Sequence, residues 1–128
     1  MKNIPFDRPS IGKQEIQAVA KVLKSGWLTM GEETVRFEEE FSKYVGAKYA
    51  IAVNSCTAAM FLSLKALGIK EGDEVIVPAF TFPSTVSVVI HCGAVPVFAD
   101  IRADDFTMDQ KSFERVITKK TKAVIPVH

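Results

Sequence analysis

The fold of this chain is decided by residues 74–99, which read EVIVPAFTFPSTVSVVIHCGAVPVFA. Two short runs rich in valine, residues 74–77 and 95–99, enclose a segment that predicts a helix from about residue 81 to residue 92. Pro83 suits the first turn of this helix, where its missing N–H costs no hydrogen bond. Strand, helix and strand with short connections predict a parallel unit, whose crossover is right-handed.

The alternation of strand and helix extends on both sides of this unit. Residues 49–53 are a short apolar run typical of a buried parallel strand, and residues 58–67 predict the helix that follows it. After the unit, Asp109 is a candidate cap for a helix that runs to about residue 117. A fourth strand begins at residues 122–125. We therefore predict an α/β fold with a mostly parallel sheet and helices on both faces.

Helical periodicity marks two further segments before the sheet. Residues 13–24 place apolar side chains on one face and are followed by Ser25-Gly26, which ends the helix. Residues 32–44 repeat the pattern, and the acidic run Glu38–Glu40 predicts a solvated side. The side of this second helix that we expect to be buried carries Val35, Phe37, Phe41 and Tyr44.

Composition and charge exclude several functional classes. Hydrophobic residues make up 48% of the chain and charged residues 24%, as in globular domains, and the net charge of +1 gives no field that favours nucleic acid or a membrane surface. Two cysteines are too few for a disulfide scaffold, and no apolar run is long enough to span a bilayer. The N-terminus lacks the apolar core of a signal peptide, so a cytoplasmic protein is expected.

The C-terminal residues suggest that more of the protein follows. The chain stops directly after a β-branched run, at Ile125-Pro126-Val127-His128, whereas domains normally finish in polar and exposed residues. We therefore expect this chain to be the first part of a longer protein.

Residues 54–57, Asn-Ser-Cys-Thr, are the most informative candidate for binding. They join a predicted strand to a helix at the sheet edge where α/β folds bind ligands, and the free N–H groups and dipole of a helix start attract phosphate. Ser55 and Thr57 add hydroxyl donors, and Cys56 is small enough for close approach of a ligand to the backbone. The pattern by itself favours a simpler role, in which Asn54 or Ser55 only caps the helix. A reactive thiol at Cys56 is a further alternative to a small packing residue.

Phe82 is the second candidate, because an aromatic side chain at the start of the next helix lies on the same edge. An exposed ring at this position can stack on a flat heterocycle. The alternative is that Phe80 and Phe82 share a face of an extended segment and both pack into the core, and the pattern by itself favours that alternative. The two histidines, His91 and His128, are too far apart in the sequence to suggest a metal site.

The stretches that carry a family resemblance are Pro9–Gly12, Ser25–Gly31, Phe37-Glu38, Asn54–Ala59, Gly72–Pro78, Thr81-Phe82, Gly93–Asp100 and Thr118–His128. In this order and spacing, the chain resembles the DegT/DnrJ/StrS family of nucleotide-sugar aminotransferases. The resemblance implies a type I pyridoxal-phosphate (PLP) fold and transamination of a keto-sugar nucleotide for amino-sugar or polysaccharide biosynthesis, with glutamate as the usual amino donor. It also implies an arm, helix and loop over residues 1–30 and the incomplete first half of the large domain over residues 31–128.

By position, the resemblance reverses both interpretations that the pattern favours. Ser55, Cys56 and Thr57 correspond to the family's phosphate-binding turn for PLP, and Phe82 to the aromatic side chain that stacks on the pyridine ring. Cys56 stands where the family often has glycine or alanine, which is tolerable because the contact is through the backbone. Trp27 and Thr29 match a segment near the active-site entrance and dimer interface, so they are candidate substrate contacts.

The resemblance also implies residues that we expect beyond His128. These are the Schiff-base lysine and the aspartate that pairs with the pyridine nitrogen, and both are essential to the chemistry. We therefore predict no catalytic residue and no metal ligand within the chain, and no transamination by the chain alone. The implied partners are a nucleotide-sugar substrate, an amino donor and a second copy in a homodimer, with no nucleic acid or membrane. The alternatives are a PLP-dependent sugar dehydratase of the same family, with histidine in place of the lysine, and a non-catalytic remnant or binding module.

Overall fold

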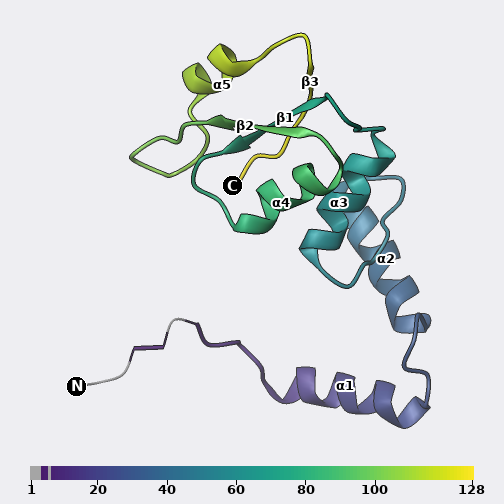
Figure 1. Cartoon of the computed structure of the whole chain (residues 1–128). Helices are drawn as coiled ribbons and strands as arrows, with labels where there is room; N and C mark the ends of the chain where they lie inside the picture. The colour runs from purple at the N-terminus through teal and green to yellow at the C-terminus, as the bar shows by residue number, and fades with distance from the viewer. Residues whose placement is uncertain (1–3, 6) are drawn as a thin grey trace. The chain divides into compact units, whose positions relative to one another are not determined.

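Three parallel strands form the sheet of this protein in the computed structural model, which describes residues 4, 5 and 7–128. The chain divides into two units, Met1–Ala52 and Val53–His128, and the sheet belongs to the second. Strand β1 (Glu74–Pro78) lies between β2 (Val95–Ala99) and β3 (Thr121–Val124), and both neighbours run parallel to it (Figure 1).

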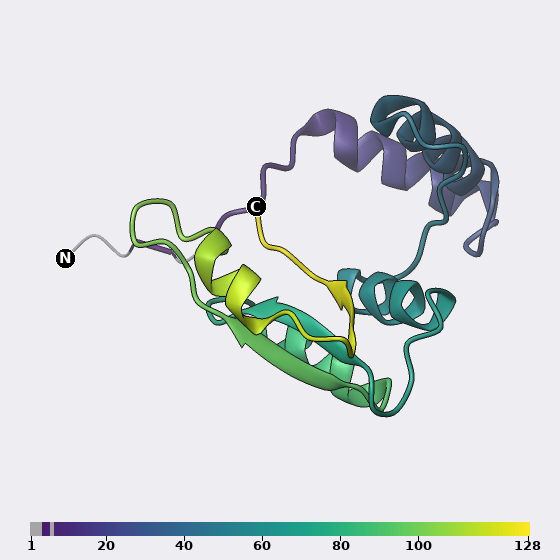
Figure 2. The same ribbon diagram turned by 90° about the horizontal axis from the view of Figure 1, so that it is seen from above.

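Helices cover both faces of the sheet, as the sequence predicts. Helix α3 (Cys56–Ala66) packs against α4 (Pro83–His91), and α4 contacts β1 and β2. Helix α5 (Gln110–Val116) contacts β2 from the opposite face, as both views show (Figures 1 and 2). The α/β architecture with a parallel sheet is therefore confirmed.

The core is built around the central strand. Val75, Ile76 and Val77 are fully buried, because a strand covered on both faces has no side for a polar residue. Val88 and Val89 of α4 form one cluster with Val75 and Val77. Pro83 occupies the first turn of α4, as predicted, so its missing N–H disturbs no hydrogen bond within the helix.

The first unit contains two helices, α1 (Lys13–Ser25) and α2 (Glu32–Val45), close to their predicted bounds. Neither helix has a buried residue, so the predicted buried side of α2 is wrong in this structure. Its members are 47–88% exposed: Val35, Phe37, Phe41 and Tyr44. Periodicity determines which side chains share a face of a helix, but only a neighbouring element can bury that face.

Residues 49–53 are not a strand, so the prediction of a buried parallel strand at these residues is wrong. Tyr49 and Ile51 are 75% and 80% exposed, and these residues pair with no strand in the described part of the chain. An apolar run becomes a strand only where neighbouring backbone groups complete its hydrogen bonds. Here the Ala52 N–H donates instead to the Glu38 carboxylate, with 2.7 Å between N and Oε1. Glu38 is thus half-buried and bonded rather than part of a solvated helix side.

Candidate functional site

The start of α3 is formed by Ser55, Cys56 and Thr57. Ser55 is the N-cap residue, and its hydroxyl oxygen accepts the Ala58 N–H at 3.1 Å, which confirms the predicted helix cap. All three residues are exposed. Among the hydrogen bonds of the described residues, none uses the backbone N–H of Cys56 or Thr57, or the Thr57 hydroxyl. Three donors therefore face solvent in the first turn.

The electrostatic setting of this helix start differs from that of α1 and α2 and is shared with α4. The first turn of α1 contains Glu15, and the first turn of α2 contains Glu32 and Glu33. The first turn of α3 contains no acidic residue. The partial positive charge at the start of α3 is therefore not offset by a carboxylate of its own turn, which suits an anionic ligand such as phosphate.

Phe82 is the N-cap residue of α4 and is 75% exposed, while Phe80 is 65% exposed. The alternative that both rings pack into the core is therefore wrong. The residue between them explains this arrangement, because Thr81 is half-buried and donates its hydroxyl to Thr85 Oγ1 at 2.9 Å. Thr85 is itself buried, so the polar side chain turns toward the helix and the aromatic side chains on either side turn outward.

Topology brings the two candidate segments to one edge of the fold. Helix α4 begins directly after the carboxyl end of β1, and α3 precedes the amino end of β1. The two helices pack together, and each one returns from the carboxyl edge of the sheet toward the amino edge (Figure 1). The residues at their starts, 55–57 and 82, therefore lie on the edge where α/β folds bind ligands.

Trp27 and Thr29 belong to the first unit. Both residues are exposed and line a cavity of about 460 Å³ at the end of α1 and the start of α2. The indole orientation is fixed, because Trp27 Nε1 donates to the Met30 carbonyl oxygen at 3.0 Å. Gly31 lies directly beside the indole, where a β-carbon would come within 2.6 Å of Trp27 Cδ1.

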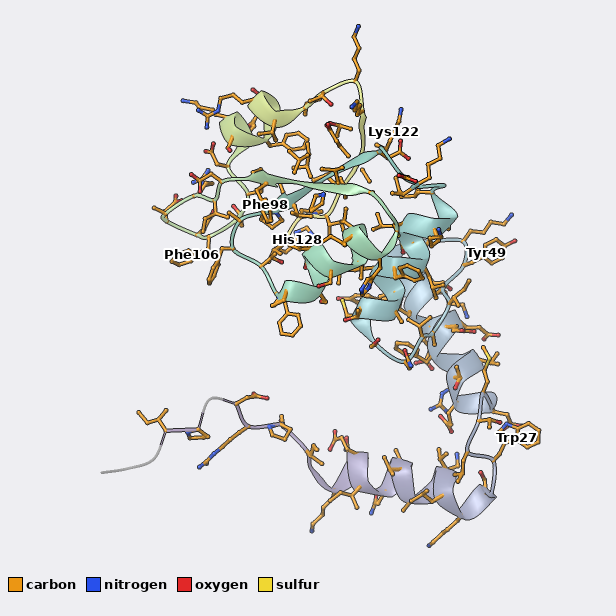
Figure 3. All side chains as sticks on the ribbon, in the orientation of Figure 1. Trp27, Tyr49, Phe98, Phe106, Lys122 and His128 are labelled. Atoms are coloured by element: carbon orange, nitrogen blue, oxygen red, sulfur yellow. The ribbon has the colours of Figure 1, made fainter. Side chains whose placement is uncertain are left out.

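Lysine side chains and possible metal ligands were the remaining candidates for a site among the described residues. Lys65, Lys70 and Lys122 are exposed, and Lys122 extends away from the sheet (Figure 3). Within residues 4, 5 and 7–128, His, Cys, Asp and Glu side chains form no group of three that could hold a metal ion. None of the described helices has the length and apolar character needed to cross a membrane.

Phe106 is a feature that the sequence analysis missed. Its φ angle is 62°, and it is the only non-glycine residue with a positive φ in the described part of the chain. Its ring lies against Phe80, with 5.8 Å between the ring centroids. The sequence does not predict this backbone conformation, because phenylalanine has no preference for the left-handed region. It therefore does not predict the contact with Phe80 either.

Residues 9–128 match the model of the DegT/DnrJ/EryC1/StrS aminotransferase family. The chain belongs to this family. The spore coat polysaccharide biosynthesis protein SpsC of Bacillus subtilis is 54% identical to the DegT/DnrJ/EryC1/StrS chain over 125 residues, which are 98% of the chain and 32% of SpsC.

Solved structures give the same assignment. The putative sugar aminotransferase Spr1654 from Streptococcus pneumoniae, in its PMP form, superposes with a TM-score of 0.89 at 46% identity. The E. coli GDP-4-keto-6-deoxy-D-mannose-3-dehydratase with bound hydrated PLP superposes with a TM-score of 0.88 at 33% identity. These matches cover 98% of this DegT/DnrJ/EryC1/StrS chain and 32% and 34% of the respective structures. The chain therefore spans about a third of the length of its relatives, and its fold is that of PLP-dependent enzymes.

Proposed function

We propose that this chain provides the phosphate-binding turn and the ring-stacking side chain for PLP in an enzyme that aminates a keto-sugar nucleotide. The observation that carries the proposal is the start of α3, where two backbone N–H groups and the Thr57 hydroxyl lack acceptors and no carboxylate shares the turn. The relatives support the choice of ligand, because Spr1654 is described in both PLP and PMP forms and the E. coli dehydratase with hydrated PLP.

The exposed residues of the turn fit the phosphate of PLP. The backbone N–H groups of Cys56 and Thr57 and the Thr57 hydroxyl would donate to phosphate oxygens, and hydrogen bonds to a charged acceptor are stronger than neutral ones. Because these groups belong to the first helical turn, they need no rearrangement before binding. Cys56 contributes its backbone, so its thiol has no required role in this contact.

Phe82 would orient the pyridine ring. Its side chain is exposed at the start of α4 and is free to pack on one face of a flat ring, where it would exclude water. When bound, PLP supplies an electron sink that makes amino transfer possible. The proposal therefore gives the role of binding and orienting PLP to four residues: Ser55, Cys56, Thr57 and Phe82. The proton transfers require the lysine and aspartate that we expect outside these residues.

The remaining partners of the reaction follow from the same proposal. We expect glutamate as amino donor, a nucleotide sugar as acceptor substrate and a second copy of the protein at the site. Trp27 and Thr29 are the candidate substrate contacts, since they line the cavity of the first unit. Because the chain holds no lysine in the expected context, we expect that it does not transaminate alone.

A sugar dehydration is the second candidate function. The superposition on the E. coli dehydratase, with a TM-score of 0.88 at 33% identity, supports it. Both candidates would use the same phosphate turn and ring contact, so the described residues do not separate them. Identification of the residue at the lysine position of the protein, lysine or histidine, distinguishes the two.

The phosphate turn is tested by replacing Thr57 with valine, which has the same shape but no hydroxyl. Loss of one hydrogen bond to a charged phosphate should weaken PLP binding by about 1 kcal/mol or more, which is roughly fivefold or more in Kd. The measurement is a fluorescence titration of the purified protein with PLP, followed by competition with inorganic phosphate. Thr57→Ser, which retains a hydroxyl, should bind PLP nearly as well as the unmodified protein.

Pyridoxal, which lacks the phosphate, is the matched ligand control. Thr57→Val should leave the affinity for pyridoxal unchanged, because the hydroxyl contacts only the phosphate. An unchanged affinity for PLP in Thr57→Val would contradict the assignment of this turn.

A further inference from the structure

The loop between β2 and α5 holds Phe106 in a backbone conformation that a benzyl side chain does not favour. Its φ angle of 62° lies in the left-handed region, which glycine, asparagine and aspartate adopt far more readily. A conformation of this kind persists only where the surrounding structure enforces it, and such positions are often functional.

Backbone hydrogen bonds close this loop on both sides of Phe106. Ile101 and Met108 form an antiparallel bridge, and the Arg102 N–H donates to the Thr107 carbonyl oxygen at 2.8 Å. The Phe106 N–H donates to the Arg102 carbonyl oxygen at 3.1 Å. The residues on either side of Phe106 are therefore held in place by contacts that do not involve its ring.

Side chains reinforce the same loop. The Arg102 guanidinium pairs with Asp104, and this contact holds the pKa of the Asp104 carboxyl below its usual range. The Asp105 carboxylate accepts both the backbone N–H of Thr107, at 2.9 Å, and its hydroxyl, at 2.7 Å. These contacts over-determine the loop conformation, which explains how the left-handed residue is tolerated.

The ring of Phe106 packs on Phe80. The ring centroids are 5.8 Å apart and the planes are tilted by 49°, which is a favourable geometry for an aromatic pair. Phe106 lies on the loop between β2 and α5 (Figure 3), and the residue is 57% exposed. Phe80 is 65% exposed, so the hydrophobic core does not hold it.

Phe80 lies within a short segment that is otherwise fixed only at its two ends. The Ala79 N–H donates to the Ala99 carbonyl oxygen at 2.8 Å, and the Thr81 hydroxyl donates to Thr85. Among the described residues, no backbone hydrogen bond holds Phe80 itself. Its contact with Phe106 is therefore the restraint at the middle of the segment that ends at Phe82.

We propose that Phe106 is a positioning residue that acts through Phe80 to fix residues 79–82, and so sets where Phe82 meets the pyridine ring of PLP. The last part rests on the proposed function. The ordering of residues 79–82 does not, because the ring contact and the loop hydrogen bonds are formed by residues of this chain alone. The two parts can therefore be tested separately.

The first test removes the ring while it preserves the loop. Phe106→Gly suits the positive φ angle, so the backbone should keep its conformation and only the contact with Phe80 is lost. In the cofactor-free protein, amide hydrogen exchange at Ala79 should become faster by about three- to tenfold, the range expected for loss of an aromatic pair. Phe80→Ala should give the same increase, and Phe106→Tyr should restore slow exchange.

Phe98→Ala is the matched control for loss of an exposed ring. Phe98 is 52% exposed on the neighbouring strand β2 and does not contact Phe80 in an aromatic pair (Figure 3). Phe98→Ala should leave the amide exchange rate at Ala79 equal, within experimental error, to that of the unmodified protein. Unchanged exchange in Phe106→Gly, or the same increase in Phe98→Ala, would overturn the positioning role whether or not PLP binds.

The second test asks whether the effect reaches the cofactor through Phe82. Phe106→Gly should weaken PLP binding by about three- to tenfold and reduce the induced circular dichroism of bound PLP. In a Phe82→Ala background the same substitution should have no further effect. An equal loss of PLP affinity on Phe106→Gly in the unmodified protein and in the Phe82→Ala variant would overturn the route through Phe82. Failure of the unmodified protein to bind PLP would instead contradict the proposed function, and the exchange measurement would still decide the positioning role.

Discussion

At the residue scale, Gly31 shows how one missing β-carbon shapes a candidate substrate contact. Gly31 is the N-cap residue of α2, with an extended backbone, so no positive φ angle requires glycine here. The requirement is space, because the indole of Trp27 occupies the volume that a β-carbon would fill. Trp27 can therefore donate its indole N–H to Met30 only while residue 31 is glycine.

Gly31→Ala should displace the indole and break the bond from Trp27 Nε1 to Met30. A β-carbon at 2.6 Å from Cδ1 is closer than van der Waals contact allows, so the ring must move. Trp27 is the only tryptophan of the sequence, so its fluorescence emission reports the movement directly. We expect a shift in emission maximum and intensity.

Gly12→Ala is the matched control for this prediction. Gly12 is also an extended N-cap glycine, of α1, but its added β-carbon would meet only the flexible end of Glu15, at 3.2 Å. The emission spectrum of the Gly12→Ala variant should equal that of the unmodified protein. Identical spectra for both variants would show that the indole does not depend on residue 31.

At the element scale, α5 depends on its cap. The helix has seven residues, and a helix this short gains little from its own hydrogen bonds. The Asp109 carboxylate accepts the Ser112 N–H at 2.6 Å, and the Ser112 hydroxyl in turn accepts the Asp100 N–H at 2.8 Å. The cap therefore ties the helix to the chain as it leaves β2.

Asp109→Ala should lower the free energy of unfolding by about 1 kcal/mol, because the Ser112 N–H loses its acceptor. Urea unfolding followed by far-ultraviolet circular dichroism measures the change. Asp109→Asn retains an acceptor and should cost only a few tenths of a kcal/mol. Equal stability of the alanine and asparagine variants would argue against the cap.

At the scale of the whole molecule, the two units differ in how much they bury. The buried apolar residues of the described chain all lie in the second unit: Leu64, Ile69, Val75, Ile76, Val77, Val88, Val89, Cys92, Ala94 and Ala99. Helices α1 and α2 contribute none. Regions with few buried contacts open most readily, so the first unit should be the less stable one.

Limited proteolysis checks this difference. Trypsin should cut first within residues 13–48, where Lys13, Lys24 and Lys43 are exposed, and should leave a longer-lived fragment that starts at Tyr49, after cleavage at Lys48. Mass spectrometry of early time points identifies the order of cleavage. First cuts at Lys65 or Lys70, which are also exposed but lie in the second unit, would contradict the prediction.

Much of this architecture could be predicted from local sequence. The runs around β1 and β2, Pro83 in the first turn of α4, and the caps Ser55 and Asp109 depend on interactions within a few residues, so the pattern predicts them correctly. The family could also be recognised from the sequence, because its motifs occur in a fixed order along the chain.

Contacts between distant residues were decided only by the tertiary structure. The apolar run at residues 49–53 has the composition of a strand but pairs with no strand among the described residues, and Phe37 and Phe41 of α2 are exposed. The bond from Ala52 to Glu38 and the contact of Phe106 with Phe80 join residues 14 and 26 positions apart in the sequence. Local propensity cannot specify such contacts, because burial and pairing depend on what the rest of the chain places nearby.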